Sequence, residues 1–207
     1  MTDKEKIRLD EMMNYEKELY EKGIEYIAGI DEAGRGPLCG PVVSAAVILK
    51  KVDYIEGVND SKKISEKKRE KVYEEIVQSA ISYSVGIIDE KTIDEINILE
   101  ATRLAMKKAV ENLQVKPEHV LVDAEKKVPI EAPYTPIIKG DALSVSIAAA
   151  SIIAKVTRDR IMRQWDEVYP IYGFAKHKGY GTEEHRKIIK ENGPCIIHRK
   201  TFIKNIV

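Results

Sequence analysis

The stretch Tyr26-Ile27-Ala28-Gly29-Ile30-Asp31-Glu32-Ala33-Gly34-Arg35-Gly36-Pro37 decides how the rest of the chain is interpreted. Its first half is β-rich and ends on two carboxylates, and its second half is a glycine loop with one arginine. Asp123 closes another apolar run, and Asp141 stands where a helix should begin. If these segments become neighbours in one sheet, their carboxylates can stay ionised together only with hard divalent cations among them. The pattern favours a metal-dependent phosphodiester hydrolase.

Composition places the chain among globular proteins of ordinary domain size. Its 207 residues are 43% hydrophobic and 33% charged, which is enough for one full core. Lys+Arg and Asp+Glu both number 34, so the net charge indicates no particular partner. The distribution is more informative, because residues 176–207 hold eight Lys/Arg against three Glu. This part of the chain is the expected anion-facing surface.

Apolar runs and cysteines give no sign of a membrane or secreted protein. No apolar run approaches the length that crosses a bilayer, and the charged N-terminal stretch has no signal-peptide core. Cys39 and Cys195 form no Cys-x-x-Cys motif, and the four histidines show no ligand spacing. The sequence therefore predicts neither a zinc site nor a disulfide framework, and we expect a cytoplasmic protein.

Hydrophobic spacing and turn residues predict strands and helices in alternation. Five β-rich runs bounded by turn residues predict strands, namely 26–31, 41–49, 82–88, 119–123 and 134–138. Apolar residues at helical spacing predict helices at 4–22, 65–80, 98–113 after a capping box at 92–95, 141–168, and from Thr182 to Gly193. Pro136 argues for an edge strand, and Arg158, Arg160 and Arg163 for a solvated cationic helix end. The order favours an α/β layered domain with a mixed sheet.

Several of these residues also have ordinary structural explanations. Asp141 could simply cap its helix, and Gly34-Arg35-Gly36 could be a plain turn rather than a loop whose N–H groups reach a ligand. Lys155 interrupts an apolar helix, so it must extend to solvent, form an ion pair or point into a polar cleft. Tyr180 stands between two glycines in a cationic loop, which suits a platform that stacks on a sugar or base. The run Lys67-Lys68-Arg69 is interpreted as solvated surface.

Seven short motifs stand in order along the chain. They are Ile30–Pro37, Asp60–Lys63, Val122-Asp123, Lys139–Asp141, Ala148–Asp159, His177–Thr182 and His198–Phe202. In this order they resemble bacterial ribonuclease HII over nearly the whole chain from Tyr26 onward. The resemblance implies a ribonuclease H-like fold, with a mixed five-stranded sheet flanked by helices and a small C-terminal helical segment. The predicted N-terminal helix makes residues 1–24 a helical extension, and the resemblance implies a catalytic domain at 25–170 and a C-terminal substrate-binding loop and helix at 171–207.

The resemblance further implies roles for individual residues. Four carboxylates become the catalytic, metal-binding residues of a two-metal Mg²⁺ or Mn²⁺ site, namely Asp31, Glu32, Asp123 and Asp141. Recognition of the ribonucleotide and its junction with DNA falls to Gly34, Arg35, Gly36 and Tyr180. Contacts with phosphates fall to Lys62 and Lys155.

One departure from the family pattern concerns the residues after Asp123. They are Ala124-Glu125, where many relatives have Gly-Asn. The ligand itself is retained. The shape of its loop stays open, and Glu125 could add negative charge near the site.

The implied activity is hydrolysis of the RNA strand of RNA–DNA hybrids and cutting at single ribonucleotides in duplex DNA, leaving 5′-phosphate and 3′-hydroxyl ends. We expect a monomer that uses no covalent protein nucleophile. Two other classes stay open from the residues alone. A catalytically silent nucleic-acid-binding module would need no carboxylate cluster. A metal-dependent phosphatase for small molecules would have no use for the basic C-terminal region or the loop around Tyr180.

Overall fold

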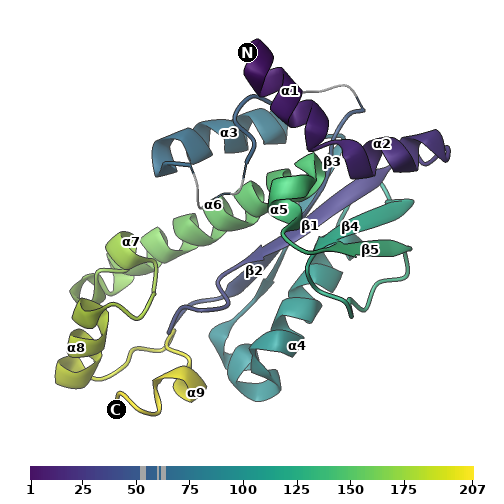
Figure 1. Cartoon of the computed structure of the whole chain (residues 1–207). Coiled ribbons are helices and arrows are strands. Elements are labelled where there is room, and N and C mark those ends of the chain that lie inside the picture. Colours follow the sequence, from purple (N-terminus) through teal and green to yellow (C-terminus); the bar gives the residue numbers. More distant parts are fainter. Residues whose placement is uncertain (52–54, 60, 62–63) are drawn as a thin grey trace.

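A mixed five-stranded sheet forms the centre of the molecule (Figure 1). The computed structural model describes residues 1–51, 55–59, 61 and 64–207. The strand order is β3-β2-β1-β4-β5, with bounds Ser82–Ile88, Val42–Ile48, Ile27–Ala33, His119–Asp123 and Tyr134–Ile137. Strand β2 pairs antiparallel with β1 and β3, whereas β4 pairs parallel with β1 and β5. The predicted α/β class and mixed sheet are confirmed, and Pro136 does lie in an edge strand.

Helices cover both faces of this sheet. The long helix α6 (Val145–Val168) and α3 (Glu66–Ser79) lie on one face, and α4 (Glu90–Glu111) lies on the other. Successive side chains of β2 point to opposite faces, so Ala45 and Val47 pack with α6 while Ala46 and Ile48 pack with α4. Strand β2 is buried on both sides, which explains why all of its residues except Ser44 are apolar.

The N-terminal segment forms two helices, and the single helix predicted over 4–22 was wrong. Helix α1 spans Asp3–Glu11 and α2 spans Asn14–Glu21, with the turn at Met12 and Met13. Both methionines are buried in the core cluster that includes α6, and the Met12 carbonyl accepts a hydrogen bond from the Val145 N–H at 3.1 Å. In a continuous helix the Met12 carbonyl would accept a hydrogen bond from residue 16, so its bond to Val145 accompanies the break.

Helix α4 starts earlier than predicted, and the capping box at 92–95 was wrong. Asp89 caps the helix, accepting a hydrogen bond from the Thr92 N–H at 2.8 Å. The helix is kinked at Asn97, whose φ is +66°. The Asn97 Oδ1 accepts hydrogen bonds from the N–H groups of Leu99 and Glu100, so this side chain caps the second part of the helix. The predicted start at residue 98 coincides with that second part.

The segment predicted as one helix over 141–168 is divided at Ser144. Short helix α5 spans Gly140–Leu143, and the Ser144 hydroxyl then caps α6 by accepting a hydrogen bond from the Ile147 N–H at 3.2 Å. Beyond α6 come η1 (Pro170–Tyr172), α7 (Phe174–His177), α8 (Glu183–Asn192) and α9 (Lys200–Ile203). Thr182 caps α8, as predicted. No helix among the described residues is long and apolar enough to cross a membrane.

Candidate active site and substrate cleft

Parallel pairing of β1 with β4 brings two predicted carboxylates side by side. Ile30 pairs with Val122 across the two strands, so the next residues, Asp31 and Asp123, are neighbours. Both project to the face that α6 covers, because the side chain of Leu121, two residues before Asp123, packs with Ile147. On β1, the residue two positions before Asp31 is Gly29. It faces α6, because a Cβ there would collide with the backbone of Ser146. Asp31 is thereby buried between β1 and α6, with 5% of its surface exposed.

The other two carboxylates are linked to this pair through the backbone: Glu32 comes directly after Asp31, and Asp141 comes directly after Gly140, which contacts Asp123. Gly140 donates its N–H to the Asp123 Oδ1 at 2.7 Å, which fixes the start of α5 and hence Asp141 next to β4. Lys139, at φ +59°, turns the chain into that helix. Asp141 is buried, and it does not cap α5, because it lies within the first turn. We call Asp31, Glu32, Asp123 and Asp141 the acidic cluster.

Electrostatics in the acidic cluster match an oxygen-ligated cation site. Burial raises the pKa of Asp31 well above its ordinary value, and the charges of Glu32 and Asp123 raise it further. Hydrogen bonds from Ser151 and from the Glu32 N–H, the latter at 2.7 Å, act in the opposite direction. Carboxylates that disfavour one another's ionised form are stabilised by a hard divalent ion, and their oxygens are the ligands such ions prefer. The residues present therefore fit Mg²⁺ or Mn²⁺.

A cleft of about 270 Å³ opens beside the acidic cluster. Five of the predicted substrate-binding residues line it, namely Gly34, Arg35, Gly36, Lys155 and Tyr180. Glu32, Ala33, Ser61 and Ser151 complete the lining. The fold therefore gathers residues from β1, α6 and the loop before α8. Lys62 lies outside the described residues.

Tyr180 and Lys155 form one wall of the cleft. The Tyr180 side chain is 45% exposed, and its ring lies 3.8 Å from where a Cβ of Gly36 would be. The Lys155 Nζ lies 5.9 Å from the centre of that ring and 2.7 Å from the Asp159 Oδ1. Lys155 thus both forms an ion pair and faces the cleft. The exposed ring is free of the core and available to a ligand.

Arg199 anchors the glycine loop, residues 34–36, from behind. Its guanidinium is fully buried and donates five hydrogen bonds of 2.6–3.0 Å to backbone carbonyls. The acceptors are the carbonyl oxygens of Gly34, Arg35, Pro37 and Gly40. Arg199 belongs to the motif His198–Phe202, but the motif does not indicate this role. A buried, carbonyl-directed arginine leaves no periodicity or spacing signal, since arginine is usually exposed.

Arg158 is a second buried arginine that binds backbone carbonyls. The prediction of a solvated cationic end for α6 was wrong at this position. Its side chain is only 1% exposed and donates to the carbonyls of Pro41, Lys178 and Cys39 at 2.9–3.1 Å. It therefore ties the segment after the glycine loop to the segment before Tyr180. Gly34, at φ +100°, is required for this packing because a Cβ there would collide with the Arg158 side chain.

The interpretation of Lys67-Lys68-Arg69 as solvated surface was wrong for Arg69. This arginine is buried and donates to the Ser61 carbonyl at 2.9 Å and to Asp159 at 3.3 Å. Asp159 is also the partner of Lys155, and the Ser151 and Ser61 hydroxyl oxygens lie 3.0 Å apart. Arg69 thus fixes one side of the cleft by joining α3, α6 and the segment at residue 61.

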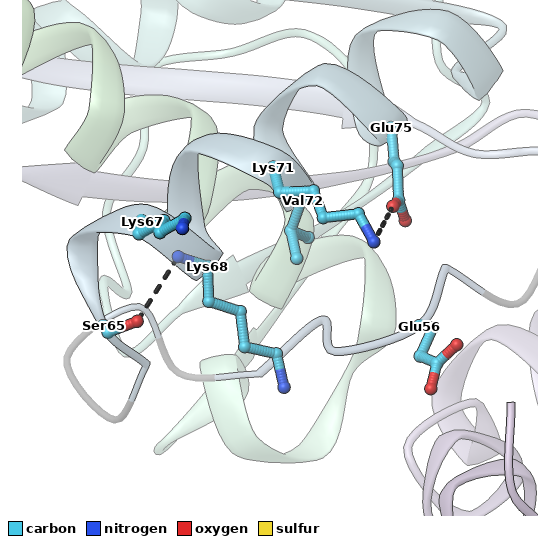
Figure 2. A pocket seen from close by; sticks show the side chains of 7 residues that line it. All are labelled: Glu56, Ser65, Lys67, Lys68, Lys71, Val72 and Glu75. Carbon is cyan, nitrogen blue, oxygen red and sulfur yellow. Dashed lines mark hydrogen bonds and ion pairs between the residues drawn. The ribbon is translucent and has the colours of Figure 1, made fainter.

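The two lysines beside Arg69 line a larger hollow of about 700 Å³ against α3 (Figure 2). Lys67, Lys68 and Lys71 project around it, and Lys71 pairs with Glu75 at 3.6 Å. It shares no lining residue with the cleft beside the acidic cluster. Volume alone is therefore a poor guide to the site in this molecule.

The departure at Ala124-Glu125 leaves the strand end intact. Ala124 adopts the left-handed conformation with φ +50°, a region that glycine enters more readily. Glu125 pairs with Arg103 of α4 at 3.0 Å and accepts a hydrogen bond from the Lys127 N–H. The added carboxylate is therefore paired with a cation on α4.

A mixed sheet whose adjacent parallel strands both carry carboxylates near their carboxyl ends, next to a glycine loop, is the arrangement of a nuclease of the ribonuclease H type. The family model described as Ribonuclease HII matches residues 28–205. The ribonuclease HII of Acetivibrio thermocellus is 59% identical over 205 residues, which are 99% of this chain and 80% of that protein. The chain belongs to the ribonuclease HII family. It is a metal-dependent endoribonuclease that cleaves the RNA strand of RNA–DNA hybrids and cuts at embedded ribonucleotides.

Solved structures agree with this fold. The PCNA:RNase HII complex of Archaeoglobus fulgidus superimposes with a TM-score of 0.74 at 30% identity, covering 87% of this chain and 96% of that one. Bst-RNase HIII in complex with Mn²⁺ matches with a TM-score of 0.63 at 20% identity, over 86% of this chain and 64% of that one. The second similarity concerns the fold alone.

Proposed function

We propose that Asp31, Glu32, Asp123 and Asp141 hold two divalent ions, Mg²⁺ or Mn²⁺, at which the RNA strand is hydrolysed to 5′-phosphate and 3′-hydroxyl ends. The observation that carries this proposal is the register of β1 with β4, which aligns Asp31 with Asp123 on one face. The Mn²⁺ found with Bst-RNase HIII is consistent with it. When bound, such ions would activate the attacking water and stabilise the charge on the leaving 3′ oxygen.

The protein's own contribution is to hold the carboxylates in place before metal binds. The Asp31 Oδ1 is held by the Glu32 N–H, and the Asp123 Oδ1 is held by the Gly140 N–H, both at 2.7 Å. Each bond leaves further lone pairs of the same carboxylate for a cation. Since these donors belong to the backbone, the ligand oxygens stay oriented without reorganisation of side chains.

Recognition of the ribonucleotide belongs to the glycine loop. The carbonyls of Gly34 and Arg35 point to Arg199, and in a trans peptide the following N–H points the opposite way. The N–H groups of Arg35 and Gly36 therefore face away from Arg199, and both residues line the cleft. Two such donors suit the 2′-hydroxyl, which distinguishes RNA from DNA.

The opposite wall serves the sugar-phosphate backbone. The exposed Tyr180 ring stacks on the sugar beside the scissile phosphate, and Lys155 and Lys62 contact phosphates. Residues 25–170 act as the catalytic domain. Residues 171–207 add the positive charge that holds the duplex. The enzyme acts in the cytoplasm as a monomer on RNA–DNA hybrids and ribonucleotide-containing duplex DNA.

The test uses matched DNA, RNA–DNA and single-ribonucleotide duplexes with Mg²⁺ or Mn²⁺, followed by mapping of the ends. Asp123→Asn and Asp31→Asn remove a negative ligand while nearly preserving shape, so cleavage should fall by orders of magnitude while hybrid binding persists. Glu125→Gln is the matched control, because this neighbouring carboxylate is paired with Arg103 and should not be needed. Near-normal turnover of both Asn variants would refute the assignment.

A further inference from the structure

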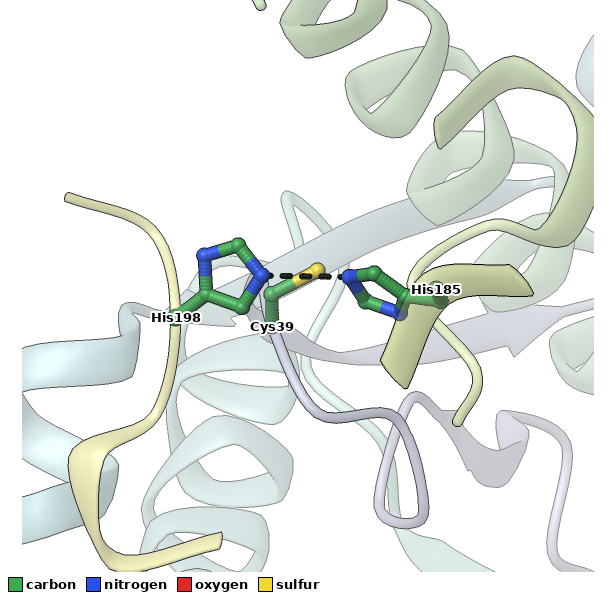
Figure 3. A group of neighbouring side chains, drawn as sticks. All are labelled: Cys39, His185 and His198. Carbon is green, nitrogen blue, oxygen red and sulfur yellow. Dashed lines mark hydrogen bonds between the residues drawn. The ribbon is translucent and has the colours of Figure 1, made fainter. Parts of the chain in front are cut away.

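Three side chains that are far apart in the sequence meet in the C-terminal part of the molecule. Cys39 lies between the glycine loop and β2, His185 lies in the first turn of α8, and His198 precedes α9 (Figure 3). Their ligand atoms, one from each residue, all lie within 4.8 Å of one another. Cys39 and His185 are fully buried and His198 is 3% exposed. Figure 3 shows the Cys39 Sγ directed toward the line between the two imidazoles.

Hydrogen bonds determine which ring nitrogens carry protons. The His185 Nδ1 lies 2.9 Å from the Tyr180 carbonyl, so it must donate, and its Nε2 carries a lone pair. The His198 Nε2 lies 3.1 Å from that Nε2 and therefore donates to it, while its Nδ1 accepts from the Cys195 N–H at 3.0 Å. Burial lowers the pKa of each imidazole to about 4, so both rings are neutral at pH 7. Neutral imidazoles are the form that binds metals.

A second acceptor near His198 serves the other tautomer. The Cys195 carbonyl lies 3.3 Å from the His198 Nδ1, so a proton on Nδ1 can be donated there, at the cost of the hydrogen bond from the Cys195 N–H. Both imidazoles would then present Nε2 lone pairs to the Cys39 side, each with its Nδ1–H donated to a backbone carbonyl. Metal-binding histidines commonly have this second hydrogen bond, which fixes ring orientation.

We propose that Cys39, His185 and His198 bind a Zn²⁺ ion at a site separate from the acidic cluster. Two nitrogens and one sulfur are a donor set that Zn²⁺ accepts and that Mg²⁺ and Mn²⁺ disfavour. Ligand atoms around tetrahedral Zn²⁺ lie about 3–4 Å apart, so a small inward movement of the Cys39 side chain completes the geometry. Three protein ligands leave the fourth position to a water.

Binding releases one proton per ion. Burial raises the pKa of the Cys39 thiol to about 12, so without metal it keeps its proton. On coordination the S–H bond gives up that proton to solvent and the sulfur forms the bond to Zn²⁺ as thiolate. The His198 proton moves from Nε2 to Nδ1 and is not lost. Affinity should therefore increase about tenfold per pH unit near neutrality.

The site would join three segments that frame the cleft. Cys39 follows the glycine loop, and its backbone already forms a bridge with His198. The His185 Nδ1–H donates to the Tyr180 carbonyl, so the position of His185 determines the position of Tyr180 in the cleft wall. Zn²⁺ here would hold the C-terminal segment to the glycine loop.

Cobalt spectroscopy on the untagged, chelator-treated full chain tests the site directly. Titration with Co²⁺ should give a thiolate-to-cobalt charge-transfer band and the visible bands of tetrahedral Co²⁺, saturating at one ion per chain, and Zn²⁺ should abolish both. The acidic cluster offers only oxygen ligands and cannot give the thiolate band. Zn²⁺ at a hundredfold excess over its Kd should raise Tm by about 5–10 °C.

Two cysteine variants distinguish this site from adventitious binding. Cys39→Ala should lose the charge-transfer band and the Zn²⁺-dependent rise in Tm, with its fold checked by circular dichroism without metal. Cys195→Ala should keep both, because its sulfur lies by the His198 Nδ1, on the other side of the ring. A wild-type chain without the thiolate band would overturn the proposal, and so would a band that survives Cys39→Ala.

Discussion

Arg199 shows how one residue can shape a site without touching the reaction. Burial lowers the pKa of its guanidinium to about 10, so the side chain stays charged at neutral pH. Its five hydrogen bonds equal the number of N–H donors a guanidinium possesses, which offsets the cost of burying the charge. A lysine has three donors and no planar fork, so it could not hold the same four carbonyls.

Tyr180 gives a prediction at this scale. Tyr180→Ala should lose about 1–3 kcal/mol of stacking and reduce discrimination at the RNA–DNA junction, whereas Tyr180→Phe should keep most of it. Because the side chain is 45% exposed, neither variant should change Tm appreciably. The measurement is the ratio of cleavage rates on a single-ribonucleotide duplex and a continuous hybrid. An unchanged ratio together with a large drop in Tm would assign the ring to the core.

Residue chemistry could be predicted from the sequence where it is local. Asp31 and Glu32 follow an apolar run and precede two glycines, and Tyr180 stands between two more. The residues next to them in the sequence are therefore enough to identify them as candidate site residues. Arg158 and Arg69 do not, because their partners are carbonyls and carboxylates elsewhere in the chain. Their burial follows from tertiary packing, which no local pattern encodes.

At the scale of elements, the junction between α2 and α6 contains a buried carboxyl group. Glu16 is 1% exposed, and its Oε1 accepts hydrogen bonds from the Ser144 hydroxyl at 2.6 Å and the Ser146 N–H at 3.0 Å. Its Oε2 has no hydrogen-bond partner within the described part of the chain. Burial raises the pKa of Glu16 above its ordinary 4.5. The junction therefore favours the protonated acid.

This pKa shift predicts a pH dependence of stability. The folded chain holds the Glu16 proton more tightly than the unfolded chain, so the free energy of unfolding should fall as pH rises from 4.5 through the raised pKa. Glu16→Gln keeps the acceptor oxygen and removes the titration. Urea unfolding in the presence of a chelator measures this. Between pH 4.5 and 8, the free energy of unfolding of Glu16→Gln should increase relative to that of the wild type. Glu18→Gln, exposed on the same helix, should show no such trend, and a gap independent of pH would contradict the assignment.

Element boundaries divide into those set locally and those set by packing. The five strands and the Thr182 cap follow from alternation and capping chemistry, which lie within the segment itself. The breaks at Met12 and Ser144 depend on contacts between α1, α2 and α6, and the Val145 N–H that meets Met12 is more than a hundred residues away. The helical spacing of apolar residues continues across both breaks, so it does not predict them.

On the scale of the whole molecule, the N-terminal helices share the main core. Leu9 is fully buried in the cluster that also contains Ile152 and Val156 of α6, whereas Ile7 on the same helix is 61% exposed. Leu9→Ala should therefore destabilise the protein by about 2–5 kcal/mol and Ile7→Ala by little. Chemical denaturation of the full chain measures both. Equal stabilities would mark residues 1–24 as a detachable extension.

The anchoring of the glycine loop has a consequence for protein synthesis. Arg199 follows Gly40 by 159 residues, so the ribosome adds the loop first and its anchor much later. At about 5–20 residues per second this interval lasts roughly 8–30 s. The nascent chain already contains all four carboxylates while its glycine loop still lacks the five hydrogen bonds that shape it. The glycine loop can therefore reach its final, anchored shape only after residue 199 has left the ribosome.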